Sequence, residues 1–322
     1  MRTGVWLFPD APSPAIVDAA RAAEEAGLDE FWLGDEGVGR DPFVLLAAAA
    51  MVTERILLGV AVTNPYLRHP AATAAAAATV QELSGGRVVL GIGTGGDLAL
   101  GPVGIAREQP FARVADAVRV MRGVTTAVPV AGYDPPPHAL PRSDVPIYIG
   151  ARSERLNRLA SSAADGVFLG GIPRGSLAEA VGWARSVRPV DVAVYVNAAF
   201  DPAEREHLRG VLLRPLLDGP LATRVRLGVD AEIASAADRA LVAGDDRPAR
   251  AVIEDRILDE FVLAGDRDQI GRGLADLVLD LQPTSIGLTL HPGNDPIGSV
   301  HRGADVLGRA RRHVAETPSR PA

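Results

Sequence analysis

Several residue types are missing or scarce in this sequence of 322 residues, and each absence excludes a kind of chemistry. There is no cysteine, which excludes disulfides, thiolate nucleophiles and cysteine metal ligands. There is no lysine, since all 33 basic residues are arginine, and this excludes Schiff-base catalysis by a lysine side chain. Only 4% of the residues are aromatic, so aliphatic side chains and alanine must fill the interior.

Charge, hydropathy and histidine spacing exclude further classes of protein. The formal net charge of −7 argues against a broad nucleic-acid-binding surface. No uninterrupted apolar stretch reaches the roughly 20 residues that span a membrane, and Met1–Val5 lacks the apolar run of a signal peptide. The histidines show no zinc-type spacing, so no metal site is expected. We therefore expect a soluble, cytoplasmic protein that binds neither nucleic acid nor membrane.

What the sequence does contain is a regular alternation of short apolar runs with helical segments. Eight runs have the length and composition of strands: 5–8, 30–34, 56–63, 88–92, 147–149, 167–169, 191–197 and 286–290. Strands that alternate with helices predict an α/β protein with a parallel sheet. Eight units favour closure into a (β/α)8 TIM barrel, and an open doubly wound sheet is the alternative.

The segment 202–280 departs from this alternation, because it is mostly helical and longer than one crossover requires. We expect it to form a helical insertion between the seventh and eighth strands. The whole chain, 1–322, is expected to be a single barrel domain with a frayed tail over 316–322.

In a TIM barrel the active site lies at the carboxyl ends of the strands, so the residues after each run are the candidates. Asp35 and Glu36 follow the second run, and adjacent carboxyl groups there can exchange protons or anchor a polar ligand. A turn aspartate beside a solvated glutamate is the competing interpretation. The stretch Gly91–Gly96 has the spacing of a dinucleotide-binding motif, but Gly101–Pro102 interrupts the helix that this motif requires. A glycine-rich mouth that admits a flat ring fits better than a dinucleotide site, and a flexible loop is the alternative.

The ends of the fifth and sixth runs suggest an anion site. Gly150–Arg152 joins the fifth run to a helix, and Gly170–Gly171 ends the neighbouring run. Backbone N–H groups at the start of a helix attract an anion, and Arg155 and Arg158 add positive charge nearby. Ordinary barrel turns are the competing interpretation.

Two longer strings carry a family resemblance. Residues 59–70 read GVAVTNPYLRHP, and residues 82–95 read ELSGGRVVLGIGTG. Together they closely resemble the bacterial luciferase-like superfamily, and within it the branch similar to methylene-tetrahydromethanopterin reductase. The stretches Ala26–Asp35 and Ala163–Val167 fit the same superfamily. The resemblance covers about residues 4–172 well and 263–292 loosely.

The resemblance implies a (β/α)8 barrel that binds coenzyme F420, with the deazaflavin ring at the strand mouths. It also implies a bulge in the third strand with a non-prolyl cis peptide near Ala61–Val62, and a phosphate held after the fifth and sixth strands. Cationic partners for the acidic tail would be Arg152, Arg155 and Arg174. The residues expected at the cofactor are Asp35, Ala61, Val62, Thr63, Asn64, Gly93, Thr94, Gly95, Gly150, Ala151, Arg152, Gly170 and Gly171.

The implied activity is hydride transfer between F420 and a small organic substrate, with Asp35 and Glu36 as the catalytic residues. Many relatives carry Asp-His after the second strand, where this chain has Asp35-Glu36. A sugar-phosphate dehydrogenase of the family would also have Glu in place of Gly96, so the resemblance leaves the substrate open. The alternatives are an FMN-dependent monooxygenase and a binding protein without turnover. Relatives form dimers, and we expect a homodimer or higher homo-oligomer, with the alanine-rich helix 71–79 as a candidate contact.

Overall fold

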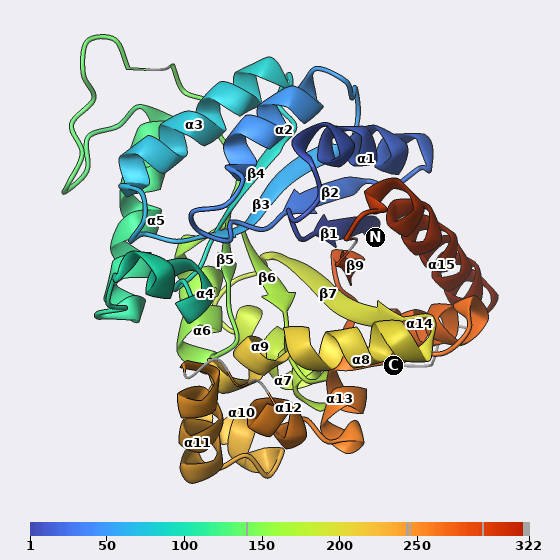
Figure 1. Ribbon diagram of the computed structural model, residues 1–322. Helices are drawn as coiled ribbons and strands as arrows, with labels where there is room; N and C mark the ends of the chain where they lie inside the picture. Colours follow the sequence, from blue (N-terminus) through green and yellow to red (C-terminus); the bar gives the residue numbers. More distant parts are fainter. Residues whose placement is uncertain (140, 243–244, 246, 292, 318–322) are drawn as a thin grey trace.

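The computed structural model describes residues 1–139, 141–242, 245, 247–291 and 293–317, and its strands form a closed parallel barrel (Figure 1). The barrel strands pair in the order β1-β2-β3-β4-β5-β6-β7-β9, and β9 pairs again with β1. Their bounds are β1 Arg2–Leu7, β2 Glu30–Leu33, β3 Leu57–Thr63, β4 Val88–Ile92, β5 Ile147–Gly150, β6 Gly166–Gly170, β7 Asp191–Ala199 and β9 Ser285–Leu290. This confirms the TIM barrel predicted from the strand–helix alternation.

One strand was missed in the sequence. The short β8, Val262–Ala264, pairs in parallel with the end of β7 at Asn197–Ala199. It directly follows helix α13, Asp255–Phe261, so its three residues read as the last turn of that helix. The eight expected strands do close the barrel, and β8 is an additional short strand beside β7.

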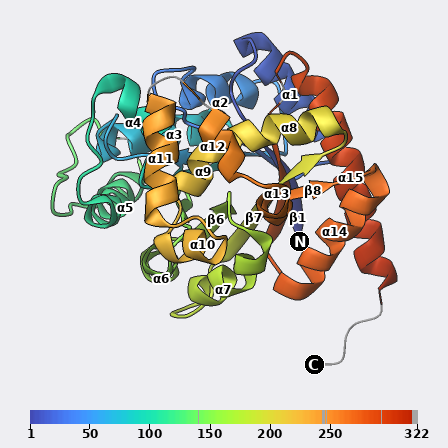
Figure 2. The same cartoon turned by 60° about the horizontal axis from the view of Figure 1, so that its bottom comes forward.

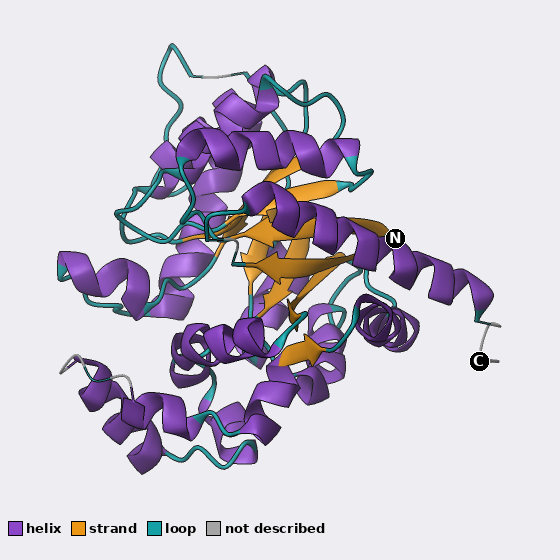
Figure 3. Ribbon diagram, turned by 45° about the vertical axis from the view of Figure 1, so that its right-hand side comes forward, coloured by secondary structure: helices purple, strands orange, loops and turns teal. Residues whose placement is uncertain are grey.

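Helices surround the strands, as the purple and orange ribbons of Figure 3 show. Those that alternate with the barrel strands are α1 Ser13–Glu25, α2 Pro42–Ala50, α3 Pro70–Leu83, α5 Pro110–Thr126, α6 Glu154–Ala163, α7 Arg174–Ala184, α14 Arg267–Leu281 and α15 Pro296–Glu316. The connection after β4 adds the short helices α4, Asp97–Leu100, and η1, Gly101–Val103. No helix among the described residues has both the length and the apolar character that crossing a membrane requires.

Further helices follow β7 and gather beside the barrel (Figures 1 and 2). They are α8 Pro202–Val211, α9 Leu213–Leu217, α10 Leu221–Arg226, α11 Ala231–Val242, α12 Arg247–Val252 and α13. With the exception of α10, they contribute to an apolar core that includes Leu208, Leu212, Leu216, Ile257 and Phe261. This helical segment lies between β7 and β8, within the range 202–280 expected to be helical.

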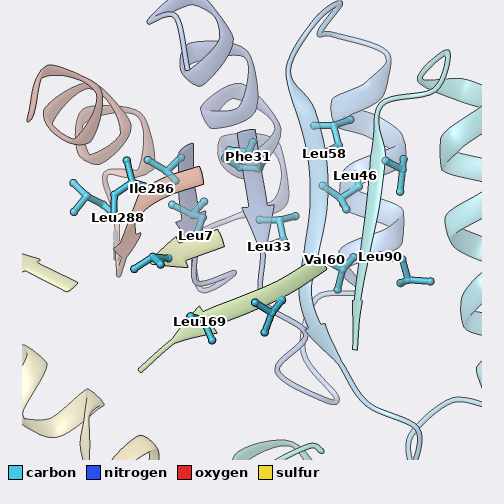
Figure 4. Close-up of a cluster of buried hydrophobic side chains, with 14 of the residues drawn as sticks. Leu7, Phe31, Leu33, Leu46, Leu58, Val60, Leu90, Leu169, Ile286 and Leu288 are labelled. Carbon is cyan, nitrogen blue, oxygen red and sulfur yellow. The ribbon is translucent and has the colours of Figure 1, made fainter. Parts of the chain in front are cut away.

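The main apolar core lies between the strands and the surrounding helices, because alternate strand residues point outward. Figure 4 shows this layer, with Leu58 and Val60 of β3 close to Leu46 of α2. The barrel interior holds a second cluster that includes Trp32, Tyr148, Phe168 and Tyr195. Large aromatic rings therefore fill much of the barrel interior.

A buried carboxylate closes the amino end of the barrel. Glu30 is 1% exposed and accepts hydrogen bonds from Trp32 Nε1 at 2.9 Å, Tyr195 Oη at 2.8 Å and Ser285 Oγ at 2.7 Å. Its second oxygen accepts from Arg2 Nε at 2.5 Å. A buried charge is stable only when it is paired and hydrogen-bonded, as here. This network leaves the opposite, carboxyl end of the strands open for a site.

Candidate functional site

A cavity of about 590 Å³ opens at the carboxyl ends of the barrel strands. Every residue that was expected at the catalytic site or the cofactor lines this cavity, with the exception of Thr63. The set comes from the ends of five strands, β2 to β6, and so from positions more than 100 residues apart in the chain. The barrel topology brings them together, since parallel strands end on the same side.

Thr63 supports the cavity from behind. Its side chain is buried, and its Oγ1 donates a hydrogen bond of 2.6 Å to Asp35 Oδ2. Asp35 lines the cavity, and burial raises the pKa of its carboxyl group, while the bond from Thr63 acts in the opposite direction. Thr63 therefore contacts Asp35, a residue of the cavity lining, and does not itself line the cavity.

Glu36 is the strongest candidate for proton exchange in the cavity. Burial, reinforced by the neighbouring charge of Asp35, raises the pKa of Glu36 to about 7, and Arg152 acts in the opposite direction. A Cβ atom at Gly34 would lie 2.6 Å from Trp6 Cζ2 and 2.7 Å from Glu36 Oε1. The absence of a side chain at Gly34 thus lets the Trp6 ring and the Glu36 carboxyl group converge.

The floor of the cavity is formed by β3 and its neighbours. The peptide bond between Ala61 and Val62 is cis although neither residue is proline, as the resemblance implied. The pairing of β3 with β4 shifts register between Val60 and Thr63, which is the expected bulge. A Cβ atom at Gly93 or at Gly150 would lie only 2.7 Å from a methyl group of Val62. Backbone and one small apolar side chain therefore make up this part of the surface.

The ends of β5 and β6 form the cradle that was expected for an anion. Arg152 lies across it, with Nε donating to the carbonyl oxygen of Gly170 at 3.1 Å and Nη1 to that of Pro215 at 3.3 Å. Burial lowers the pKa of Arg152, while Asp218 and Glu36 counteract this. At the start of α6, the side chain of Ser153 makes no capping hydrogen bond. The first turn of this helix, from which Ser153 and Arg155 line the cavity, therefore has no side-chain cap.

The other two arginines expected near an acidic tail have different positions. Arg155 lines the cavity, and its guanidinium carbon lies 4.3 Å from the ring centre of Phe111. Arg174 lines a separate surface hollow and donates to the backbone carbonyl of Asp259. Arg174 does not line this cavity, because its side chain contacts α13 instead of the barrel mouth.

Several lining residues were not singled out as site residues in the sequence. Arg107 donates to the carbonyl oxygen of Gly95 at 3.0 Å and lies 3.7 Å from a carboxylate oxygen of Asp218. Asp218 follows α9, so this contact and the bond from Arg152 to Pro215 join α9 to the barrel mouth. Neither residue follows a strand directly, and no sequence pattern marks them.

Other lining residues that were not singled out in the sequence are aromatic. Trp6 and Phe8 come from β1 and the residue after it, and His291 follows β9. The ring centre of His291 lies 6.0 Å from that of Trp6 and 5.6 Å from that of Phe8. Burial lowers the pKa of His291 to about 4, and His207 contributes to the shift. His291 is therefore neutral at physiological pH. The strand-end rule points to these positions, but the sequence does not show that they form one wall.

Comparison with known proteins agrees with this architecture. The model of a family described as luciferase-like monooxygenase matches residues 1–281. The 5,10-methylenetetrahydromethanopterin reductase of Methanolobus tindarius is 29% identical over 316 residues, which cover 92% of this chain and 95% of the relative. An F420-dependent glucose-6-phosphate dehydrogenase of Nakamurella multipartita is 36% identical over 175 residues, 47% of this chain and 50% of the relative.

Among solved structures, the F420-dependent tetrahydromethanopterin reductase from Methanopyrus kandleri has a TM-score of 0.81 and 23% identity, covering 97% of this chain and 99% of that one. An F420-dependent secondary alcohol dehydrogenase in complex with an F420-acetone adduct has a TM-score of 0.70 and 17% identity, covering 97% of this chain and 100% of that one. At these identities the likeness concerns the fold.

Proposed function

Because the chain belongs to the luciferase-like monooxygenase family, we propose that it is an oxidoreductase that uses coenzyme F420 for hydride transfer with a small organic substrate. The names of two relatives, a glucose-6-phosphate dehydrogenase and a tetrahydromethanopterin reductase, state F420 dependence. The observation that carries the proposal is that one cavity joins a flat floor of backbone, at Ala61, Val62, Gly93 and Gly150, to a cationic cradle at Arg152. A flat ring with an anionic tail matches these two parts.

The residues present fit such a coenzyme. Gly93 and Gly150 leave no side chain above Val62, so a planar ring can lie against the floor. Arg152 and the uncapped start of α6 offer a cation and backbone N–H groups to a phosphate. Arg155, at the outer side of the cradle, offers a second cation to a longer acidic tail.

When bound, the deazaflavin supplies a two-electron carrier that exchanges a hydride with a carbon atom of the substrate. The chain supplies orientation, exclusion of water and the accompanying proton. With a pKa of about 7, the Glu36 carboxyl group is divided between its protonated and ionised forms near neutral pH, so it can give or take that proton in either direction of the reaction. Asp35 accepts the hydrogen bond from Thr63 and places a negative charge beside Glu36, which contributes to the raised pKa of Glu36.

Titration of the purified protein with F420, and separately with FMN, tests the cofactor assignment. F420 that binds tightly, with quenched fluorescence, while FMN binds weakly or not at all, is the expected result. A preference for FMN would instead indicate an oxygen-using monooxygenase, the activity that the family description names. If neither compound binds, the proposed function is wrong.

A further inference from the structure

The cavity has two chemically different sides, and the order of the strands sets them apart. In the ring β1-β2-β3-β4-β5-β6-β7-β9, strands β4 and β5 lie opposite β9 and β1. Three of the arginines that line the cavity come from the connections after β4 and β5: Arg107, Arg152 and Arg155. Trp6, Phe8 and His291 come from the opposite strands. These three arginines and the aromatic wall therefore face each other across the barrel mouth. A fourth lining arginine, Arg214, comes from α9, the helix whose Pro215 carbonyl accepts a hydrogen bond from Arg152.

The aromatic wall offers no formal charge to a ligand. We use this name for Trp6, Phe8 and His291, whose ring centres lie 5.6 to 6.2 Å from one another. Burial keeps the imidazole of His291 neutral, since its pKa is about 4. His207, whose ring centre lies 6.3 Å from that of His291, is on the exposed side of α8 and does not line the cavity.

The remaining residues of this side are uncharged as well. Thr289 of β9 and Asn197 of β7 line it from the strands, and Val211 and Leu212 line it from the end of α8. The amide nitrogen of Asn197 donates to the carbonyl oxygen of Phe261 at 3.4 Å, which holds this side chain in place. A ligand here meets rings, methyl groups, one hydroxyl group, one amide and one neutral imidazole.

Glu36 lies at the boundary between the two sides. Its carboxyl oxygen Oε1 and the ring of Trp6 both lie close to Gly34. On the cradle side, the charge of Arg152 acts to lower the pKa of Glu36. A substrate against the aromatic wall therefore brings its reacting carbon next to the proton-exchanging carboxyl group. An anionic ligand would place its charge against the wall, where a buried carboxylate or phosphate without a cation is strongly disfavoured.

We infer that the substrate is an uncharged, largely apolar carbonyl compound or the corresponding alcohol, which packs against Trp6, Phe8 and His291. This inference rests on the proposed function for its chemistry, because a hydride and a proton together convert a carbonyl group into an alcohol. It assigns the arginine side of the cavity to the coenzyme and separates this protein from enzymes that act on phosphorylated sugars.

A matched pair of probes tests the inference: acetophenone and 4-acetylbenzoate, which differ by one carboxylate group. Binding is measured by ligand-observed saturation-transfer NMR, first on the F420-loaded protein and then on the protein alone. We expect acetophenone to bind at least about tenfold more tightly than 4-acetylbenzoate, because the carboxylate would lie against the wall without a cation. A factor of ten corresponds to about 1.4 kcal/mol. His291→Lys, which adds a cation to the wall, is expected to narrow or reverse this preference, and His291→Gln is expected to keep it.

The outcomes separate the two proposals. If F420 does not bind, the proposed function is wrong. The relative affinity of the two probes for the protein without coenzyme still tests whether the wall disfavours a carboxylate. If F420 binds but 4-acetylbenzoate binds as tightly as acetophenone, or neither probe binds the loaded protein, the inferred substrate class is wrong. Coenzyme binding that is unchanged in both His291 variants shows that they are folded. A His291→Lys variant that binds F420 normally but leaves the probe preference unchanged overturns the role of this wall.

Discussion

Replacement of Glu36 by glutamine is expected to make the stability of the protein less dependent on pH. The pKa of Glu36 rises from 4.5 to about 7 on folding, a shift of about 2.5 units, and one unit corresponds to about 1.36 kcal/mol. The penalty on the buried carboxylate is therefore about 3 kcal/mol. Because the folded pKa is the higher one, the stabilisation is fully present below pH 4.5 and is lost as the pH rises toward about 7. Glutamine stays neutral and avoids this loss.

Urea denaturation of the wild-type protein and of Glu36→Gln at about pH 5 and about pH 8 measures the effect. The wild-type protein should lose about 2 kcal/mol more than the variant between these two values, since most of the titration falls in this window. Asp35 also titrates, but its charge is present in both proteins. Glu82→Gln, the same change at an exposed position of α3, is the control and should leave the wild-type pH dependence unaltered. Equal pH dependence in wild type and Glu36→Gln would refute the reasoning.

Two further substitutions test the fold and the cavity floor. Glu30→Gln puts an amide nitrogen among four hydrogen-bond donors and should lower the free energy of unfolding by about 3 to 5 kcal/mol, measured by urea denaturation; a loss no larger than that of Glu82→Gln would contradict it. Gly150→Ala places a Cβ atom 2.7 Å from Val62 and should weaken F420 binding at least about tenfold in a fluorescence titration. Gly182→Ala, in α7 with nothing within 4 Å, should bind F420 like the wild type, and equal affinities in both variants would exclude the proposed role of the floor.

The barrel could be predicted from the sequence because buried parallel strands are continuous apolar runs that stand out between helices. The strand ends then identified most of the cavity lining, since the topology brings those ends together. Thr63 lies outside the cavity lining for a local reason. The register shift between Val60 and Thr63 breaks the alternation of side chains along β3, so strand periodicity does not tell which residues face the cavity.

Long-range packing explains why the positions of Arg174 and Asp218 could not be predicted from the sequence. Arg174 follows β6 in sequence, as a cradle residue would, but its guanidinium group meets the backbone of Asp259 in α13. Asp218 reaches Arg107 because α9 packs over the barrel mouth. Both contacts depend on where the helices after β7 lie, and the sequence of that segment contains no motif that fixes their position.

Glu36 stands where the family resemblance leads us to expect histidine, and this difference does not remove proton exchange from the proposed site. Burial and the charge of Asp35 raise the pKa of Glu36 to about 7, close to the value of about 6.5 for an unperturbed histidine. The cavity histidine, His291, has the opposite fate, because burial lowers its pKa to about 4 and leaves it a poor proton donor. The two environments thus shift the pKa values of Glu36 and His291 in opposite directions. In the proposed function the Glu36 carboxyl group exchanges the proton near neutral pH, and in the inferred substrate site the imidazole of His291 is an uncharged part of the wall.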